Sequence, residues 1–400
     1  MPAMRICNVA LAHDPVHAGM HRAVEDFSIA LDAPIVSFGN DAAEAAAGLS
    51  AGGEAGGRVV RIAGGPGPLV RGVHRVSAAA ARAAERALAG SELVVVHSLY
   101  RAHAPWAAAW ARRHGARYWS IPHGCLDPWG MSQRGTAKRI WLGLVGRRFL
   151  DGAERIVFSS RRALEKGAAW VPAERACVVR WPVAAPAWGD RDEARHRFRE
   201  RWGIPADARV LLFLGRLHTV KRPLETVKAF MAATSAAGAA SRAHLVVAGM
   251  DGDLTAADVA AAAGRSGRVH VVGRLDGDAV AEALAAADGF VSLSFQENFG
   301  YAAAEAVAAG LPVILAPGHD LAHEMPFGKG MPGPGGLACG WLLPDDSFTA
   351  AVEAIGAWAE ADARRLEAAG DAGAAWARAE LSQERFGDAL RGLAAGGAPA

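Results

Sequence analysis

The chain has 400 residues, more than one hydrophobic core usually serves, so two domains are expected. Hydrophobic residues make up 52% of it and charged residues 21%, a balance typical of a soluble globular protein. The net charge of +2 is too small to favour nucleic acid as the partner. Because residues 1–7 lack a signal-peptide pattern and no apolar run reaches membrane-spanning length, we expect a cytoplasmic protein.

Strands and helices alternate through the first half of the chain. Short apolar runs predict the strands, and longer periodic segments predict the helices. Alternation of this kind favours a parallel sheet with helical crossovers. The predicted strands are residues 5–10, 34–38, 58–62, 93–97, 117–121, 155–158 and 177–180, and the predicted helices are residues 20–31, 69–89, 104–114, 138–150 and a segment from residue 160.

A break in this pattern falls at residues 181–189, which contain Pro182 and Pro186 and little that indicates regular structure. We interpret it as the linker between two domains. A second alternating series follows, so both halves are predicted to be doubly wound sheets of the α/β class. Its strands are residues 209–214, 244–249, 268–272, 289–293, 312–315 and 339–343, and its helices are residues 190–202, 223–237, 255–263, 278–287 and a helical tail over 348–393.

The most informative stretch is residues 292–315, where a strand, a polar loop and an Ala-rich helix beginning near Phe299 follow one another. Glu297 lies in the loop, where the unpaired N–H groups of the coming helix favour anionic ligands. Glu305 lies five residues past Gly300, about 8 Å along the helix. The two carboxylates either face one crevice, as a ligand with two sets of hydroxyls would require, or are an ordinary loop acid and a solvent-facing helix acid.

A second candidate site follows the strand at 209–214. Gly215 lets a ligand approach the backbone closely. Arg216 can grip phosphate oxygens in a fork, and Lys221 offers a compact charge five residues on. Together they could offset the charge of a diphosphate leaving group in a glycosyl transfer. The alternative is a solvated basic loop.

A third candidate site is the loop after the strand at 117–121, because open α/β sheets bind ligands at the carboxyl ends of their strands. His123 is either structural or a hydrogen-bonding partner of sugar hydroxyls. Asp127 is either a turn former or a site residue. Trp129 is either a core residue or a surface on which a sugar stacks.

Residues 134–166 carry nine Lys and Arg against three acids. A basic surface of this kind could meet anionic lipid or a diphosphate-linked acceptor. The charges of residues 138–148 nevertheless scatter around a helical wheel, which weakens the membrane interpretation. The segment is therefore a candidate for peripheral contact with the inner membrane.

Neither the acids nor the cysteines predict a metal site. Asp251 and Asp253 flank Gly252 after a strand, and acids in such turns are usually turn formers. The cysteines lie far apart without metal-binding spacing and fit a reduced compartment. They are Cys7, Cys125, Cys177 and Cys339.

The combination of these motifs resembles the retaining glycosyltransferases of the GT-B fold, in particular glycosyltransferase family 4. The resemblance covers nearly all of residues 205–345 and the first domain only in patches. The loop over residues 120–129 further looks like the acceptor-side loop of members that build bacterial exopolysaccharide and lipopolysaccharide. The matching pieces of the second domain are Gly215-Arg216 with Lys221, Val272-Gly273, residues 287–294, Glu297 to Gly300 with Glu305 eight positions on, and residues 310–313.

The resemblance implies a GT-B architecture in which two Rossmann-like domains face an interdomain cleft. Residues 1–185 would bind the acceptor and residues 190–380 the nucleotide-sugar donor, with the C-terminal helix a candidate to pack back on the first domain. The implied activity is a retaining, metal-independent hexosyltransferase of bacterial exopolysaccharide, lipopolysaccharide or glycoconjugate biosynthesis. It would use a UDP- or GDP-linked sugar and no cofactor.

The resemblance also implies roles for individual residues, and none of them is a covalent nucleophile. Four are implied to be catalytic: His123, which would reach the transferred sugar, together with Arg216, Lys221 and Glu297. The implied donor-binding set is Gly19, Gly215, Arg216 and Lys221 near the diphosphate, Asn298, Phe299 and Gly300 near the sugar, and Glu305 at the ribose hydroxyls, with Asp127 and Trp129 on the acceptor side.

Other activities stay open at this point. An epimerase or a phosphorylase could use the same scaffold, although a phosphorylase should show a cofactor-lysine context that is not found and the Glu-x7-Glu pattern favours transfer. A non-catalytic sugar-nucleotide-binding protein is a further alternative. A dinucleotide dehydrogenase is not favoured, since no Gly-x-Gly-x-x-Gly follows an early strand. The oligomeric state is not predicted.

Overall fold

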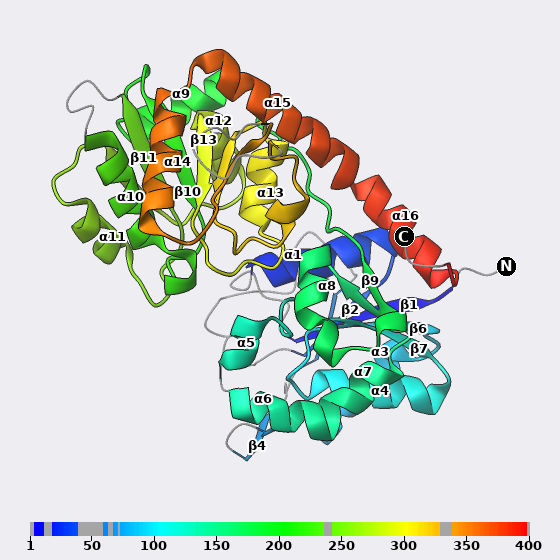
Figure 1. Ribbon diagram of the computed structural model, residues 1–400. Coiled ribbons are helices and arrows are strands. Elements are labelled where there is room, and N and C mark those ends of the chain that lie inside the picture. The colour runs from blue at the N-terminus through cyan, green and yellow to red at the C-terminus, as the bar shows by residue number, and fades with distance from the viewer. Residues whose placement is uncertain are drawn as a thin grey trace. The chain divides into compact units, whose positions relative to one another are not determined.

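The computed structural model describes residues 4–11, 18–38, 59–62, 67–70, 73–133, 135–235, 242–328 and 338–397 (Figure 1). The chain divides into two compact units. Unit 1 is Met1–Pro182 together with Gln383–Ala400, and unit 2 is Val183–Ser382. The last helix therefore belongs to the unit that contains the start of the chain.

Unit 1 contains a seven-stranded sheet in which all the paired strands are parallel, in the order β3-β2-β1-β6-β7-β8-β9. The order reverses between β1 and β6, and ligands of such sheets bind where the order reverses. The strands are β1 (Ile6–Leu11), β2 (Ile35–Phe38), β3 (Val59–Ile62), β6 (Leu93–His97), β7 (Arg117–Ile121), β8 (Arg155–Phe158) and β9 (Ala176–Val178).

Helices cover both faces of this sheet. Cys7 and Val9 of β1 share a core with α3, α4 and α7, whereas Ala10 packs with Val24 of α1 on the opposite face. The rings of Phe27 in α1 and Phe386 in α16 lie 5.1 Å apart, so α16 covers the same side as α1. The helices are α1 (Ala18–Ala30), α3 (Ala78–Leu88), α4 (His103–His114), α5 (Pro128–Ser132), α6 (Gly135–Trp141), the π-helix η2 (Leu142–Gly146), α7 (Arg147–Gly152), α8 (Arg161–Gly167) and α16 (Gln383–Ala394).

The helix predicted over residues 69–89 is wrong at its start. Residues there form an antiparallel hairpin, β4 (Gly67–Val70) and β5 (Val73–Arg75). The helix begins only at Ala78, because the side chain of Ser77 accepts a hydrogen bond from the backbone N–H of Ala80 and caps it. The valine-rich run ahead of this cap suits a strand better than a helix.

Unit 2 contains a six-stranded sheet of parallel pairs in the order β12-β11-β10-β13-β14-β15. This is the 3-2-1-4-5-6 order of dinucleotide-binding folds, with its reversal between β10 and β13. The strands are β10 (Arg209–Leu214), β11 (Ala243–Ala248), β12 (Val269–Gly273), β13 (Gly289–Ser292), β14 (Val313–Leu315) and β15 (Gly340–Leu342).

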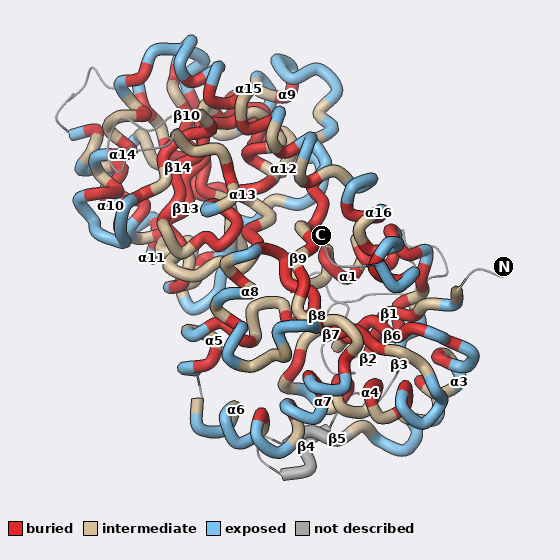
Figure 2. Tube along the Cα trace, turned by 45° about the vertical axis from the view of Figure 1, so that its right-hand side comes forward, coloured by how far each residue is buried: buried red, intermediate tan, exposed pale blue. Residues whose placement is uncertain are grey.

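The helices of unit 2 also lie on both faces of its sheet. Leu211 and Phe213 of β10 share a core with α10, α11 and α14, while α9 packs on α12 and α13 on α15. Figure 2 shows the strands of each unit as its most buried part. The prediction of two doubly wound α/β sheets is confirmed. The helices are α9 (Arg191–Arg201), α10 (Pro223–Ser235), α11 (Ala256–Ala263), α12 (Asp278–Ala286), α13 (Tyr301–Ala308), α14 (Phe348–Glu360) and α15 (Ala363–Glu380).

Among the helices of the described ranges, none combines the length and the apolar character that crossing a membrane requires.

Candidate functional site

Arg216 lies in a loop whose backbone is fixed by the loop that follows the neighbouring strand. The N–H of Gly215 donates to the carbonyl of Ala248 at 3.0 Å, and the N–H of Leu217 donates to the carbonyl of Met250 at 2.9 Å. These bonds extend the β10–β11 pairing beyond the sheet. The exposed side chain of Arg216 is therefore carried on a rigid loop at the carboxyl end of β10.

A glycine in the second loop permits this close approach. A Cβ atom added to Gly249 would overlap the carbonyl oxygen of Gly215, a backbone atom that no side-chain rotation can move. Gly215 itself has room, because a Cβ there would meet only the Phe213 ring at 4.0 Å. The Cβ side of Gly215 is therefore free of close contacts, and its role in donor binding stays a prediction.

Lys221 ends the short 3-10 turn η5 (Thr219–Lys221), which begins where the ring of His218 accepts a hydrogen bond from the N–H of Val220 at 3.1 Å. Its ammonium pairs with the carboxylate of Glu297. Burial and the neighbouring Arg216 lower the pKa of Lys221 to about 8. The contact with Glu297 acts in the opposite direction, so the ammonium is charged at neutral pH.

The loop that carries Glu297 is held on two sides by backbone hydrogen bonds. The N–H of Glu297 donates to the carbonyl of Gly318, and the N–H of Asp320 donates to the carbonyl of Glu297, both at 2.9 Å. The N–H of Phe295 donates to the carbonyl of Val220 at 3.2 Å. The loops after β10, β13 and β14 thus come together around the Lys221–Glu297 pair.

Gly300 caps α13 in a left-handed conformation, with φ of 79°. A Cβ atom there would lie 2.9 Å from Cγ of Glu297 and 3.2 Å from Nδ1 of His319, so both the conformation and the space favour glycine. Glu305 follows on α13 and is half-buried. Of the other predicted residues, Asn298 is half-buried, and Phe299 is buried with its ring 4.8 Å from that of Tyr301.

In unit 1, His123 lies two residues past the end of β7 in a left-handed conformation, with φ of 47°. The turn is closed by a hydrogen bond from the N–H of Cys125 to the carbonyl of Pro122, at 3.0 Å. The half-buried ring of His123 is bonded to the ring of His97, with Nε2 of the former 2.9 Å from Nδ1 of the latter. Burial lowers the pKa of His123 to about 4, so the ring is neutral at physiological pH.

Comparison with known families decides the classification. Residues 194–373 match the family described as "Glycosyl transferases group 1", and residues 18–182 match the "Glycosyl transferase 4-like domain". The chain belongs to the group 1 glycosyltransferases of family 4. The family predicted from the motifs is therefore confirmed.

Two curated relatives of this group 1 glycosyltransferase are D-inositol 3-phosphate glycosyltransferases. That of Thermobispora bispora is 35% identical over 153 residues, which are 36% of this chain and 35% of the relative. That of Salinispora arenicola is 32% identical over 138 residues, 33% of this chain and 31% of the relative. The chain thus spans about a third of the length of the curated relatives it matches.

Solved glycosyltransferases share the fold. Alr3699/HepE of Anabaena, solved with UDP and glucose, superposes with a TM-score of 0.73 at 14% identity, over 98% of this chain and 99% of its own. WaaG, a glycosyltransferase involved in lipopolysaccharide biosynthesis, gives 0.67 at 15% identity, over 96% of this chain and 98% of its own. These likenesses confirm the predicted GT-B fold.

Asp127 stabilises the local structure of unit 1. Its buried carboxylate caps α5 by accepting from the N–H of Trp129 at 2.9 Å, and it forms an ion pair with Lys166 at 2.9 Å. The turn-former interpretation describes these contacts, and the acceptor-side assignments of Asp127 and the half-buried Trp129 stay predictions. Gly19 is the exposed second residue of α1, and the loop before it, residues 12–17, lies outside the described residues.

The acids proposed as turn formers accept hydrogen bonds within the site loops. Asp253 accepts from the N–H of Thr219 at 2.8 Å and from its hydroxyl at 2.6 Å, so it braces the turn that leads to Lys221. Asp251 accepts from the N–H of Ala256 at 2.9 Å. The described ranges contain no cluster of three or more His, Cys, Asp or Glu side chains suited to a metal ion.

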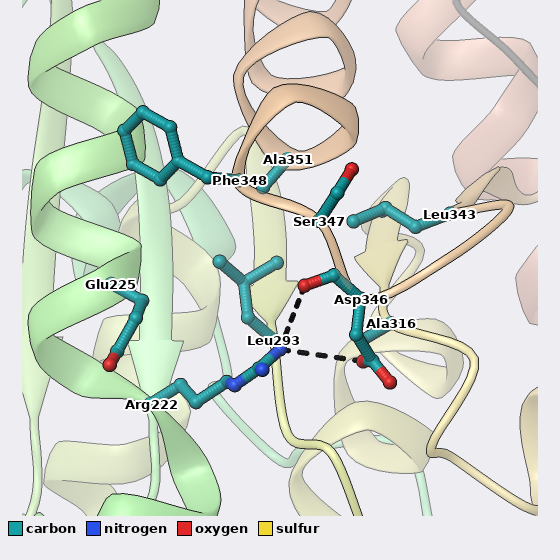
Figure 3. Close-up of a pocket in the computed structure, with 9 residues that line it drawn as sticks. All are labelled: Arg222, Glu225, Leu293, Ala316, Leu343, Asp346, Ser347, Phe348 and Ala351. Carbon is teal, nitrogen blue, oxygen red and sulfur yellow. Dashed lines mark hydrogen bonds and ion pairs between the residues drawn. The ribbon is translucent and has the colours of Figure 1, made fainter.

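A pocket of about 170 Å³ in unit 2 is lined by Arg222, which directly follows Lys221, but not by Arg216, Lys221 or Glu297 themselves (Figure 3). Its polar side is the guanidinium of Arg222, whose Nη1 donates to the Asp346 carbonyl at 3.3 Å and to its carboxylate at 3.4 Å. Glu225, Leu293, Ala316, Leu343, Ser347, Phe348 and Ala351 complete the lining.

His319 is not among the site residues predicted from the sequence. It is buried, and its Nε2 lies 2.9 Å from the hydroxyl of Ser292, which in turn lies 3.1 Å from that of Ser294. Burial, then the charges of Lys221 and His323, lower its pKa to about 3, so it supports the Glu297 loop as a neutral ring. The available signal was a polar residue in the loop after the predicted strand at 312–315, similar to the signal that singled out His123.

Proposed function

We propose that this chain is a retaining hexosyltransferase that moves a sugar from a UDP- or GDP-linked donor to a glycan or lipid-linked acceptor. The observation that carries the proposal is the grouping of Arg216 with the Lys221–Glu297 pair in unit 2. Their loops follow β10 and β13, between which the strand order reverses. The solved complexes of HepE with UDP and glucose support a UDP-linked donor.

The proposed roles of Arg216 and Lys221 follow from where negative charge develops during sugar transfer. Cleavage at the anomeric carbon leaves a nucleoside diphosphate, and two preorganised cations stabilise such a leaving group. Within the described parts of the chain, the guanidinium of Arg216 has no ion-pair partner, so it is available to a phosphate. Because Arg216 and Lys221 can neutralise the charge of the diphosphate, we propose that transfer requires neither a metal ion nor a cofactor.

The acid beside these cations is assigned to orientation and not to proton transfer. Glu297 is committed to Lys221 and held by backbone bonds on both sides, which suits a carboxylate that positions sugar hydroxyls. We propose a same-face mechanism in which the leaving phosphate helps to deprotonate the acceptor hydroxyl, with retention at the anomeric carbon. The lipopolysaccharide role printed for WaaG and the names of the D-inositol 3-phosphate glycosyltransferases support bacterial polysaccharide or glycoconjugate assembly as the setting of this activity.

Nucleotide sugars are expected to raise the melting temperature of the wild-type protein. A ligand present at 100 times its dissociation constant stabilises the native state by about 2.7 kcal/mol. Replacing Glu305 with alanine should weaken binding roughly ten- to a hundredfold, because hydrogen bonds between ribose hydroxyls and a carboxylate are lost. A thermal-shift panel of UDP- and GDP-linked sugars measures both effects.

Glu353→Ala is the matched control for this panel, since Glu353 is an exposed acid on α14 of the same unit. It should respond to the donors as the wild type does. If no nucleotide sugar stabilised the wild-type protein, the proposed donor chemistry would be abandoned. If Glu305→Ala matched Glu353→Ala, only the ribose assignment would be withdrawn.

We also propose that unit 1 contacts the cytoplasmic face of a membrane through α6, η2 and α7. Ile140 and Leu144 lie four residues apart with 57% and 78% of their surface exposed. Arg139, Arg147 and Arg148 are exposed nearby. Apolar side chains flanked by cations suit the interface of an anionic bilayer.

Leu144→Asp is expected to weaken co-sedimentation with vesicles containing phosphatidylglycerol by roughly tenfold or more, because burying a leucine contributes about 1.5–3 kcal/mol. Ile29→Asp provides the matched control, since Ile29 is 61% exposed on α1. Wild-type protein should bind neutral phosphatidylcholine vesicles less well. Equal losses in the two variants, or equal binding to both lipids, would remove the membrane proposal.

A further inference from the structure

In unit 1 the side chains of Asn8, His97 and His123 are hydrogen-bonded in series. Asn8 lies in β1 and His97 ends β6, the two neighbouring strands at which the strand order reverses. Oδ1 of Asn8 is 3.1 Å from Nε2 of His97, and Nδ1 of His97 is 2.9 Å from Nε2 of His123. Asn8 and His97 are fully buried.

These two hydrogen bonds determine the positions of the imidazole protons. Oδ1 of Asn8 is a carbonyl oxygen, which accepts a hydrogen bond but cannot donate one, so Nε2 of His97 carries the proton. Nδ1 of a neutral His97 then has a lone pair and accepts. The proton of that bond belongs to Nε2 of His123, which leaves Nδ1 of His123 as an acceptor. Within the described residues, nothing is bonded to this Nδ1.

The packing around the pair holds both rings in place. The two imidazoles stack with centroids 5.2 Å apart at 19°, Phe27 packs edge-on against His97, and Trp181 packs edge-on against His123. A titratable group on another element, His103, contacts this pair: its Nε2 lies 2.8 Å from the carbonyl oxygen of His97. Burial lowers the pKa of His103 to about 4, so it adds no charge at neutral pH.

A second titratable group lies on the His123 loop. Sγ of Cys125 lies 3.8 Å from the hydroxyl of Ser98, the residue after His97, and burial raises the pKa of its thiol. It is therefore uncharged too. Nδ2 of Asn8 has no hydrogen-bond partner among the described residues, although a buried unused donor costs roughly 1–3 kcal/mol. Asn8 is thus a poor choice for stability alone.

We propose that Asn8 and His97 are positioning residues that hold His123 as its neutral Nε2–H tautomer, so that its Nδ1 accepts a hydrogen bond from a substrate hydroxyl. The inference rests on the proposed transferase function and deepens it. The hydrogen-bonded series ends at the side-chain amide of Asn8, which cannot take up a proton. The series therefore sets the tautomer of His123 and does not carry protons away from it. Proton removal from the acceptor is then left to the donor phosphate.

Two substitutions at one position test this proposal. Asn8→Leu removes the acceptor, and we expect kcat/KM to fall about tenfold, the effect of one misdirected hydrogen bond. Asn8→Asp keeps an acceptor and should restore activity near pH 8. Its carboxylate favours a protonated His97, whose Nδ1–H would donate to His123 and move the proton of His123 to Nδ1. Activity of this variant should therefore fall as the pH decreases towards 6, whereas that of the wild type should not.

The readout independent of activity is NMR of protein with 15N-labelled histidine. The wild type should show the Nε2–H tautomer for His97 and His123, and Asn8→Leu should show mixed tautomers with an unchanged circular dichroism spectrum. A wild-type Nδ1–H tautomer at His123 would overturn the proposal even if no nucleotide sugar bound and the transferase function failed. The correct tautomer with wild-type kinetics in Asn8→Leu would overturn the positioning role and leave the transferase function standing.

Discussion

Replacing Lys221 with alanine should lower kcat about 10²–10³-fold, because one preorganised group that stabilises transition-state charge is typically worth that much. Lys221 links the two halves of the proposed donor site in unit 2: it follows β10, and its ammonium pairs with Glu297 after β13. Its loss removes charge from the leaving diphosphate and leaves Glu297 without its cation. Steady-state kinetics with the best donor of the thermal-shift panel measures the effect.

The wild-type pH profile is a second measurement of the same charge. A lysine pKa lowered to about 8 means that the ammonium is lost as the pH rises through that value, so kcat/KM should fall above about pH 8. Lys228→Ala is the matched control, because Lys228 is exposed on α10 one turn beyond the site loop. Similar kinetics for the Lys221 and Lys228 variants would refute the phosphate assignment of Lys221.

The sequence predicts the individual parts of this site well because each part is local. Arg216 and Glu297 both follow apolar strands whose ends are visible from composition alone, and the helix after Gly300 shows its own start. The strands of unit 2 lie close to the predicted positions for the same reason. Where local patterns were ambiguous the prediction failed, as at residues 69–77, where a hairpin and a Ser77 cap replace the start of a helix.

What the sequence does not contain is the order of the strands. His319 meets Gly300 because β14 lies beside β13, and His97 meets Asn8 because β6 lies beside β1, although 89 positions separate the latter two. Neither contact leaves a pattern at helical or strand spacing. The Asn8–His97 contact joins the two strands at which the order of unit 1 reverses, and His319 and Gly300 follow the adjacent strands β14 and β13 of unit 2. A correct sheet order would therefore have been enough to identify both contacts.

The same reasoning separates two neighbouring glycines. In a chain with 47 glycines, composition gives no reason to choose Gly249 over any other. The pairing of β10 with β11 places it against the backbone of Gly215, with no room for a side chain. Gly215, the glycine that the motif singled out, has free space on its own Cβ side. Their roles are therefore different: one glycine builds the loop and the other faces outward.

Gly249→Ala is consequently expected to lower the free energy of unfolding of unit 2 by about 2–4 kcal/mol, in the upper range for inserting a methyl group into packed structure. The overlapping atom is a backbone carbonyl, so the loops must separate and lose the bonds from Gly215 to Ala248 and from Leu217 to Met250. Arg216 would move with them, and stabilisation by nucleotide sugars should decline together with the melting temperature.

Gly215→Ala is the stability control for this prediction, since the same methyl group on the facing residue meets only the Phe213 ring at van der Waals distance. Its free energy of unfolding should stay within about 0.5 kcal/mol of the wild type. Chemical denaturation followed by tryptophan fluorescence compares the two variants directly. A Gly249→Ala protein as stable as Gly215→Ala would mean that the loops after β10 and β11 are not packed against each other, and the rigid placement of Arg216 would lose its physical basis.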